Sequence, residues 1–348
     1  MARTGTAGRR VAAGIAVAGI VGLGLLAIPA GAGAAPQLPP VSAEDLVSSV
    51  LAAHPGPLNG TVELDNNLGL PALPGIPQAA DGTSTARIWT DGTSKARAQV
   101  PSGTGERTLV ADGTTFWSWN SADKSVTKAP EGNRPATTPE KAATDPAAAA
   151  TEAIAKLRAT SVVSVDGTAE VAGRPAYALV LTPAPTERTL LREVRVAVDS
   201  ETRMPLQLAV LANGSSDPAL QVGFSDITFG PQDASLFTFT PPPGSTVTTP
   251  DQTAKPAKPE GPPAGATKPT VVGDGWDTVL VASMPRQDAG AAPRRGSFDL
   301  SSLGTPVSGT WGSGRLITTA VAAAIITDDG RIAIGAVPEQ VLTAALAK

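Results

Sequence analysis

Alternation of apolar and polar residues is the dominant pattern in this chain. Between residues 192 and 199, for example, Val194, Val196 and Val198 alternate with Glu193 and Arg195. This period of two is typical of antiparallel strands with one buried face and one solvated face. The same pattern predicts strands near 62–64, 85–90, 95–100, 106–111, 115–120, 125–128, 162–171, 176–183, 206–212, 220–229 and 237–240. A sheet of nine or more strands is expected to curl.

Turn residues separate these strands in the first half of the chain. Asp-Gly pairs occur at residues 81–82, 91–92, 112–113 and 166–167, and each is followed by Thr. Such pairs favour the positive φ values that tight hairpins require. The segment 68–80 contains Pro71, Pro74 and Pro77, which exclude a central strand and indicate an apolar loop. We therefore predict an antiparallel meander with a loop after its first strand.

Two segments show the period of a helix instead. Ser42 and Asp45 form a capping-box pattern ahead of Leu46, Val47 and Val50, so a helix of about eleven residues is expected from Ser42 to near residue 53. A second, Ala-rich helix is expected over residues 145–158, with Asp145 as its N-cap and Pro146 in its first turn. Both helices are short, and the sheet is the large apolar surface available to them.

The N-terminus indicates export. Arg3, Arg9 and Arg10 precede an uncharged apolar run at residues 11–28 and a series of small residues at 30–35. This order is typical of a secretory signal, and residues 1–35 are therefore predicted to be either a cleaved signal peptide or an uncleaved N-terminal membrane anchor. In both cases the rest of the chain is expected outside the cytoplasm, in the cell envelope, secreted or tethered to the membrane.

The remainder of the chain divides into two predicted domains. Residues 42–248 carry the long series of strands, and residues 249–269 are a Pro-rich linker with almost no large apolar residue. Residues 270–348 are expected to form a small C-terminal α+β domain with a strand at 271–282, a hairpin at 325–337 and a final helix after Pro338.

Charge and residue types exclude several functions. The net charge of −4 provides no basic surface for nucleic acid. There is no cysteine, and the only histidine, His54, follows the first helix, where a solvated side chain is expected. No spacing of His, Asp or Glu indicates a metal site, and no glycine-rich phosphate motif is present. We therefore expect no catalytic residues, no metal, no cofactor and no enzymatic activity.

Aromatic residues gather at one predicted hairpin, residues 108–120. Only twelve aromatics occur in the chain, yet Phe116, Trp117 and Trp119 lie within four residues. These rings could fill an ordinary core beneath the helices, or they could line a cavity for an apolar ligand in which each buried methylene contributes about 0.8 kcal/mol. By alternation, Trp117 and Trp119 would share a face and Phe116 would point to the other one.

Several blocks in a fixed order resemble the LolA-like superfamily, which includes the LolA and LolB lipoprotein carriers and the N-terminal domain of the RseB/MucB regulators. These blocks, within residues 42–248, are GTVELDNNLGLP, ARIWTDGTSKARAQV, GERTLVADGTTFWSWNSADKSVTKAP, VSVDGTAEVAGRPAYALVLTP, REVRVAVDSETRMPLQLAVL and VGFSDITFGPQDASLFTFTPPPGSTV. The resemblance implies an α+β fold, in which helices cover a curled antiparallel half-barrel sheet. It also implies binding of lipid or of a lipid-modified protein outside the cytoplasm.

Mapped by alternation, twelve residues are the candidate lipid-binding set: Val62, Leu64, Trp89, Trp117, Trp119, Leu179, Leu181, Val196, Leu208, Val210, Val222 and Phe224. The leading hypothesis is a carrier or binder of lipid or lipoprotein acyl chains. The alternative is an RseB-like envelope-stress regulator that senses lipid and contacts a membrane anti-sigma partner through its C-terminal domain. An exported hydrolase is disfavoured because the chain offers no cysteine and only one poorly placed histidine.

Overall fold

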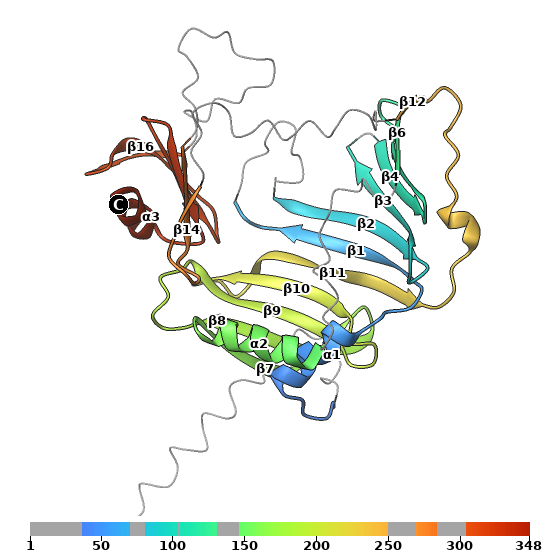
Figure 1. Ribbon diagram of the computed structural model, residues 1–348, viewed down its shortest axis with the longest axis horizontal. Helices are drawn as coiled ribbons and strands as arrows, with labels where there is room; N and C mark the ends of the chain where they lie inside the picture. Colours follow the sequence, from blue (N-terminus) through green and yellow to red (C-terminus); the bar gives the residue numbers. More distant parts are fainter. Residues whose placement is uncertain (1–36, 70–80, 104, 131–145, 250–268, 284–303) are drawn as a thin grey trace, which may run out of the picture.

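Two β-sheets make up most of the protein. A computed structural model describes residues 37–69, 81–103, 105–130, 146–249, 269–283 and 304–348 (Figure 1). One sheet has twelve strands and the other has six. The predicted signal or anchor at residues 1–35, the loop at 70–80 and nearly all of the linker at 249–269 lie outside the described residues. Within those ranges, none of the helices is both long and apolar enough to cross a membrane.

The first sheet is open, with β12 at one edge and β7 at the other. Its spatial order is β12-β6-β5-β4-β3-β2-β1-β11-β10-β9-β8-β7. The predicted large sheet is confirmed, and its pairs are antiparallel except for β12 with β6. The strands are β1 (Leu58–Asn66), β2 (Gly82–Thr90), β3 (Lys95–Ser102), β4 (Gly105–Asp112), β5 (Thr115–Asn120), β6 (Ser125–Pro130), β7 (Ser161–Val171), β8 (Arg174–Pro183), β9 (Leu191–Asp199), β10 (Pro205–Ala212), β11 (Pro218–Phe229) and β12 (Thr246–Thr248).

Pairing of β1 with β11 joins two meanders into this one sheet. Strands β1 to β6 form the first meander and β7 to β11 the second, and they meet along residues 58–66 and 220–229. A bulge at Thr61 and Val62 shifts the register of this pair. Gly60 lies beside it, and a Cβ added there would come within 2.5 Å of the Asp226 carbonyl oxygen. The seam therefore requires glycine at this position.

Both predicted helices are present and lie side by side on one face of β7, β8 and β9 (Figure 1). Helix α1 (Ala43–Ala52) begins at Ser42, whose Oγ accepts the Asp45 N–H at 3.0 Å as the capping box predicts. Helix α2 (Pro146–Arg158) contributes Ile154, and Leu46 from α1 is buried beside it. An ion pair between Arg158 and Glu44, 2.5 Å apart, links the two helices.

The chain after β11 does not form the strand predicted at residues 237–240. Instead, a 3₁₀ helix, η3 (Ala234–Phe237), begins at Asp233, whose side chain accepts the Ser235 N–H at 2.8 Å. Phe237 is buried, and η3 lies against β3 and β4. The chain then reaches β12, which pairs in parallel with β6. Residues 230–248 thus form an arm, the C-terminal arm, that crosses the first sheet from β11 to its far edge.

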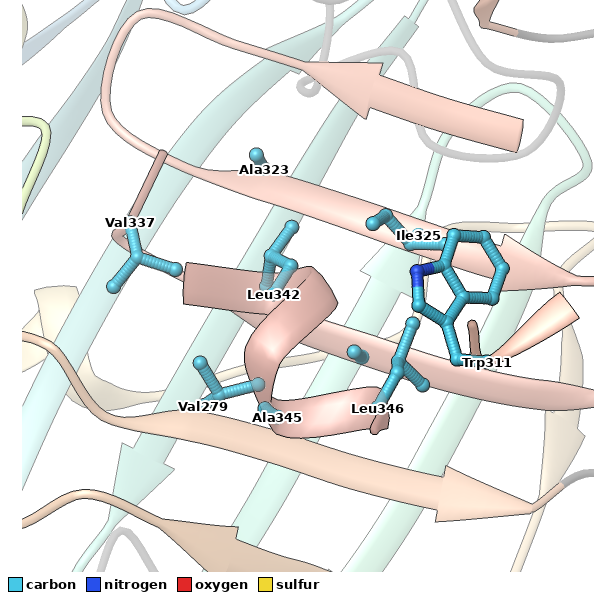
Figure 2. Packing of buried hydrophobic residues seen from close by; sticks show 9 residues of the cluster. Val279, Trp311, Ala323, Ile325, Val337, Leu342, Ala345 and Leu346 are labelled. Carbon is cyan, nitrogen blue, oxygen red and sulfur yellow. The ribbon is translucent and has the colours of Figure 1, made fainter. Parts of the chain in front are cut away.

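The second sheet contains the hairpin and the final helix that were expected in the C-terminal region. Its order is β13-β14-β18-β17-β16-β15, and α3 (Glu339–Leu346) packs on one face of it. Figure 2 shows this core, in which Leu342 and Leu346 of α3 lie among Val279, Ile325 and Trp311. The predicted strand at 271–282 is in fact two strands separated by a turn at 273–278. The strands are β13 (Thr270–Val272), β14 (Val279–Ser283), β15 (Thr305–Gly309), β16 (Gly312–Thr318), β17 (Ala323–Thr327) and β18 (Arg331–Gly335).

The loop between β8 and β9 holds the second sheet against the first. Glu187 Oε2 accepts the backbone N–H groups of Trp276 at 2.7 Å and Asp277 at 3.3 Å. The indole Nε1–H of Trp276 donates to Ser161 Oγ at 2.7 Å. Leu190 donates its N–H to the Ala336 carbonyl oxygen at 2.9 Å and packs against the core of the second sheet. Charged, polar and apolar contacts therefore all join the two sheets.

A buried carboxylate organises the turn between β9 and β10. Asp199 is fully buried, and its two oxygens accept Arg174 Nε–H at 2.5 Å and Nη2–H at 3.0 Å. The Thr202 N–H donates to the same carboxylate at 2.6 Å. Burial alone would raise the pKa of Asp199, but the hydrogen bonds from Arg174 and Thr202 outweigh it and lower the pKa to about 2.

This ion pair predicts a loss of stability in acid. Because the pKa of folded Asp199 is below the ordinary value of about 3.9, its contribution is complete above about pH 4 and is lost as the pH falls toward 2. The loss should be about 2 kcal/mol of unfolding free energy. Asp199→Asn has no charge to titrate at this position. The free energies of unfolding of the wild type and of this variant, measured in urea, should therefore differ clearly at pH 6 and little at pH 2.5. An equal difference at both pH values would contradict this role.

Candidate functional site

One continuous row of aliphatic side chains crosses six neighbouring strands of the first sheet. Residues that pair directly across strands point to the same face. The pairs Leu64 with Val222, Val222 with Leu208, Leu208 with Val196, and Val196 with Leu179 connect β1 to β8. Leu179 pairs in turn with Val165 of β7. Five of the twelve predicted site residues are therefore in one row, on the face that carries α1 and α2, which we call the helix face.

A second row runs parallel to the first on the helix face. Leu220 pairs with Val210, Val210 with Val194, and Val194 with Leu181. Val62 and Phe224 form a direct pair near the bulge on the same face. Val194 and Leu220 were not in the predicted set, although the same alternation in the sequence contains them. The structure thus brings nine of the predicted residues together.

The two helices cover only part of the helix face. Leu179 is buried beneath them, and Leu181 and Val196 pack against the same cluster. Phe224 packs instead, together with Ile227, against a separate cluster of Val171, Ala176, Ala197 and Leu206. Five predicted residues on β1, β10 and β11 lie in neither cluster and remain half-buried, so a strip of aliphatic surface continues beyond the helices: Val62, Leu64, Leu208, Val210 and Val222.

The three tryptophans lie on the opposite face, which corrects the prediction that they share the cavity wall. Trp89 pairs with Arg97, Arg97 with Val110, and Val110 with Trp117. Ile88, the neighbour of Trp89, pairs with Gly60 and therefore belongs to the helix face of Val62 and Leu64. Alternation within a strand separates two faces, but the register between strands decides which faces join.

Trp119 and Phe116 also lie on the faces opposite to those predicted. Trp119 pairs with Thr108 on the face of Trp117, and Phe116 pairs with Ala111 on the helix face. Phe116, which was expected to point away from the aliphatic residues, is thus the aromatic residue of this hairpin that lies on their face. All three residues are half-buried.

Trp117 contacts the protein's own C-terminal arm. Its ring centroid lies 5.5 Å from that of Phe239 at an interplanar angle of 44°, and the Lys128 ammonium lies 4.9 Å from its ring. On the same face, Arg97 Nη1 donates to the Leu236 carbonyl oxygen at 3.2 Å. Trp117 and Arg97 therefore hold residues 236–239 across the sheet.

Chemistry for catalysis is sparse in the described residues. His54 is exposed, as expected, and its Nδ1 lies 2.8 Å from the Ala52 carbonyl oxygen. Within the ranges that the structure describes, no group of three or more His, Asp or Glu side chains is placed to hold a metal ion. The apolar helix face is thus the candidate site, because most of the predicted site residues lie on it.

Comparisons with known proteins give similarity to solved structures alone, because no protein-family model and no curated protein matches the chain. MucB in complex with MucA(peri) is 18% identical, with 87% of this chain and 97% of that chain covered and a TM-score of 0.46. The Pseudomonas aeruginosa MucA/MucB complex is 19% identical, with 87% of this chain and 96% of that chain covered and a TM-score of 0.44. A LolA superfamily protein from Nitrosomonas europaea is 10% identical, with 57% of this chain and 99% of that chain covered and a TM-score of 0.25. Structures of MucB and of a LolA superfamily protein are therefore among those that resemble this chain.

Contact between Trp117 and Phe239 should be measurable as a coupling energy. In a double-mutant cycle, Trp117→Ala and Phe239→Ala should each lower the free energy of unfolding. The double variant should lose less than the sum of the two single losses, and the difference, the coupling energy, should be about 0.5–1.5 kcal/mol. Trp89→Ala in place of Trp117→Ala is the matched control and should show no coupling to Phe239. Additive effects in the first cycle, measured by urea unfolding, would show that the rings do not stabilise the arm.

Proposed function

We propose that this protein binds acyl chains of lipid or of lipid-modified protein on the helix face of its twelve-stranded sheet, outside the cytoplasm. The observation that carries the proposal is the half-buried aliphatic strip on β1, β10 and β11, next to the part of the same face that α1 and α2 cover. A contiguous apolar surface of this kind is typical of a binding site rather than of a solvated sheet.

Burial of methylene groups provides the binding energy in this proposal. Each buried methylene contributes about 0.8 kcal/mol, so roughly ten of them contribute about 8 kcal/mol before the cost of ordering the chain. The strip presents Val and Leu side chains without a charged residue among its five members. Such a surface suits a flexible hydrocarbon chain and has no means of selecting a polar headgroup.

A half-barrel shape would enclose the acyl chain on more than one side. The small contact area of α1 and α2, each two to four turns long, is consistent with helices that lift when a ligand enters. The proposal includes no catalytic step.

Placing a carboxylate in the strip should abolish lipid binding. We expect the full chain, isolated from its own envelope, to show adducts of lipid mass in native mass spectrometry, and Val62→Asp to lose them. Thr61→Asp is the matched control, because it places the same charge on the same strand but on the other face, and it should keep the adducts. A wild-type protein free of adducts would contradict the proposal, and thermal unfolding of both variants tests whether the sheet is intact.

A regulator that contacts a membrane protein is the second candidate. Val271, Leu280 and Ile334 form a row across β13, β14 and β18 on the face away from α3, and they are 60%, 45% and 46% exposed. Adjacent exposed aliphatic residues favour a protein contact at this surface. The partner in this proposal is an extracytoplasmic segment of a membrane protein, such as an anti-sigma factor.

Photocrosslinking tests this second candidate in the intact envelope. A photoreactive residue at Ile334 should give a discrete crosslink to a membrane protein, and Leu280→Asp should remove it. The same photoreactive residue at Ser308, which is exposed at the other edge of the second sheet, should give no such product. Equal products from both positions, or none from Ile334, would contradict a specific contact.

A further inference from the structure

A cavity lies mainly on the other side of the first sheet from the aliphatic strip of the proposed acyl site, and Val196 of the first aliphatic row also lines it. It has a volume of about 370 Å³, and residues of β7, β8, β9, β10 and β11 line it. Ala178, Ala197 and Ala209 are part of this lining, and their short side chains leave the space that larger residues would fill. A cavity of this size accommodates a small molecule.

Two arginines give this cavity its chemistry. Arg192 and Arg195, near the start of β9, both line it. Glu193 Oε1 accepts Arg195 Nε–H at 2.9 Å and Arg192 Nη2–H at 3.2 Å, so one carboxylate oxygen serves both guanidinium groups. Glu193 therefore positions the two arginines side by side and offsets part of their mutual repulsion.

One donor in this arrangement is unsatisfied. The Nε of Arg192 is buried and has no hydrogen-bond partner among the described residues. A buried guanidinium N–H without an acceptor is unfavourable, and a bound acceptor would relieve the cost. Carboxylate and phosphate oxygens are the acceptors that the guanidinium geometry fits best.

Other charges and polar groups at the cavity are consistent with a negatively charged ligand. Arg192, Arg195 and Glu193 together carry a net charge of +1. Asp166 also lines the cavity, but it is exposed, and the carboxylate that pairs with both arginines is that of Glu193. Gln207 of β10 and Gln221 of β11 add side-chain amides to the lining.

We propose that this cavity is a binding site for a small oxyanion, a carboxylate or phosphate group held by Arg192 and Arg195 with its organic part over the alanines. The site differs from the aliphatic strip on β1, β10 and β11, because Arg195 and the three alanines belong to the other face of the sheet. The oxyanion belongs either to a soluble molecule or to a lipid headgroup, since both present the same oxygens.

Calorimetric titration of the full chain with phenyl phosphate and benzoate tests the site, with neutral benzyl alcohol as the comparison. The anions should bind at least about tenfold more tightly than the alcohol, and Arg192→Gln or Arg195→Gln should weaken them by about tenfold or more. Arg107→Gln, an arginine on β4, is the matched control and should bind like the wild type. Equal binding of anions and alcohol, or unchanged binding in Arg192→Gln, would overturn the proposal.

A steric variant keeps the proposal testable if loss of an arginine disturbs folding. Ala178→Leu leaves every charge in place but fills part of the cavity, and it should also weaken phenyl phosphate binding by about tenfold or more. Unchanged affinity in this variant would place the anion elsewhere and overturn the site. Phosphatidylglycerol vesicles separate the two sources: loss of vesicle binding in Arg192→Gln supports a headgroup, and loss of phenyl phosphate binding alone supports a soluble anion.

Discussion

Pairing between β1 and β11 is the contact on which the rest of this protein depends. These strands are separated by about 150 residues in the chain, yet their backbone hydrogen bonds merge two meanders into a single twelve-stranded sheet. Loop closure over that distance is costly, so the seam must form with the packing of both halves. Without it the first aliphatic row would not extend from β11 to β1, and the helix face would be divided into two unrelated surfaces.

Local features of the fold follow directly from the sequence. The Ser42 capping box, the Ala-rich second helix and the alternation of Val194, Val196 and Val198 all predict elements that the structure contains. These signals depend on neighbours within a few residues, where propensity and periodicity decide the outcome.

Contacts between distant segments were not predictable in the same way. Trp89 and Trp117 were assigned to the aliphatic face because alternation cannot say which faces of two strands join, and a shift of one residue exchanges them. Phe237 was expected in a strand, but the Asp233 cap begins a 3₁₀ helix that packs on β3 and β4. Likewise, no local pattern shows that Glu187 meets the backbone of Trp276, 89 residues later.

The parallel pairing of β12 with β6 also orders events during synthesis. Strand β6 is complete at residue 130, but the strand that covers its free edge ends at residue 248. Until those last residues emerge, the edge of β6 is open to pairing with other chains, a known route to aggregation. The contact of Trp117 with Phe239 holds the C-terminal arm against the sheet, close to the edge that β12 covers. The same aromatic contact thus favours a covered edge over pairing of β6 with another chain.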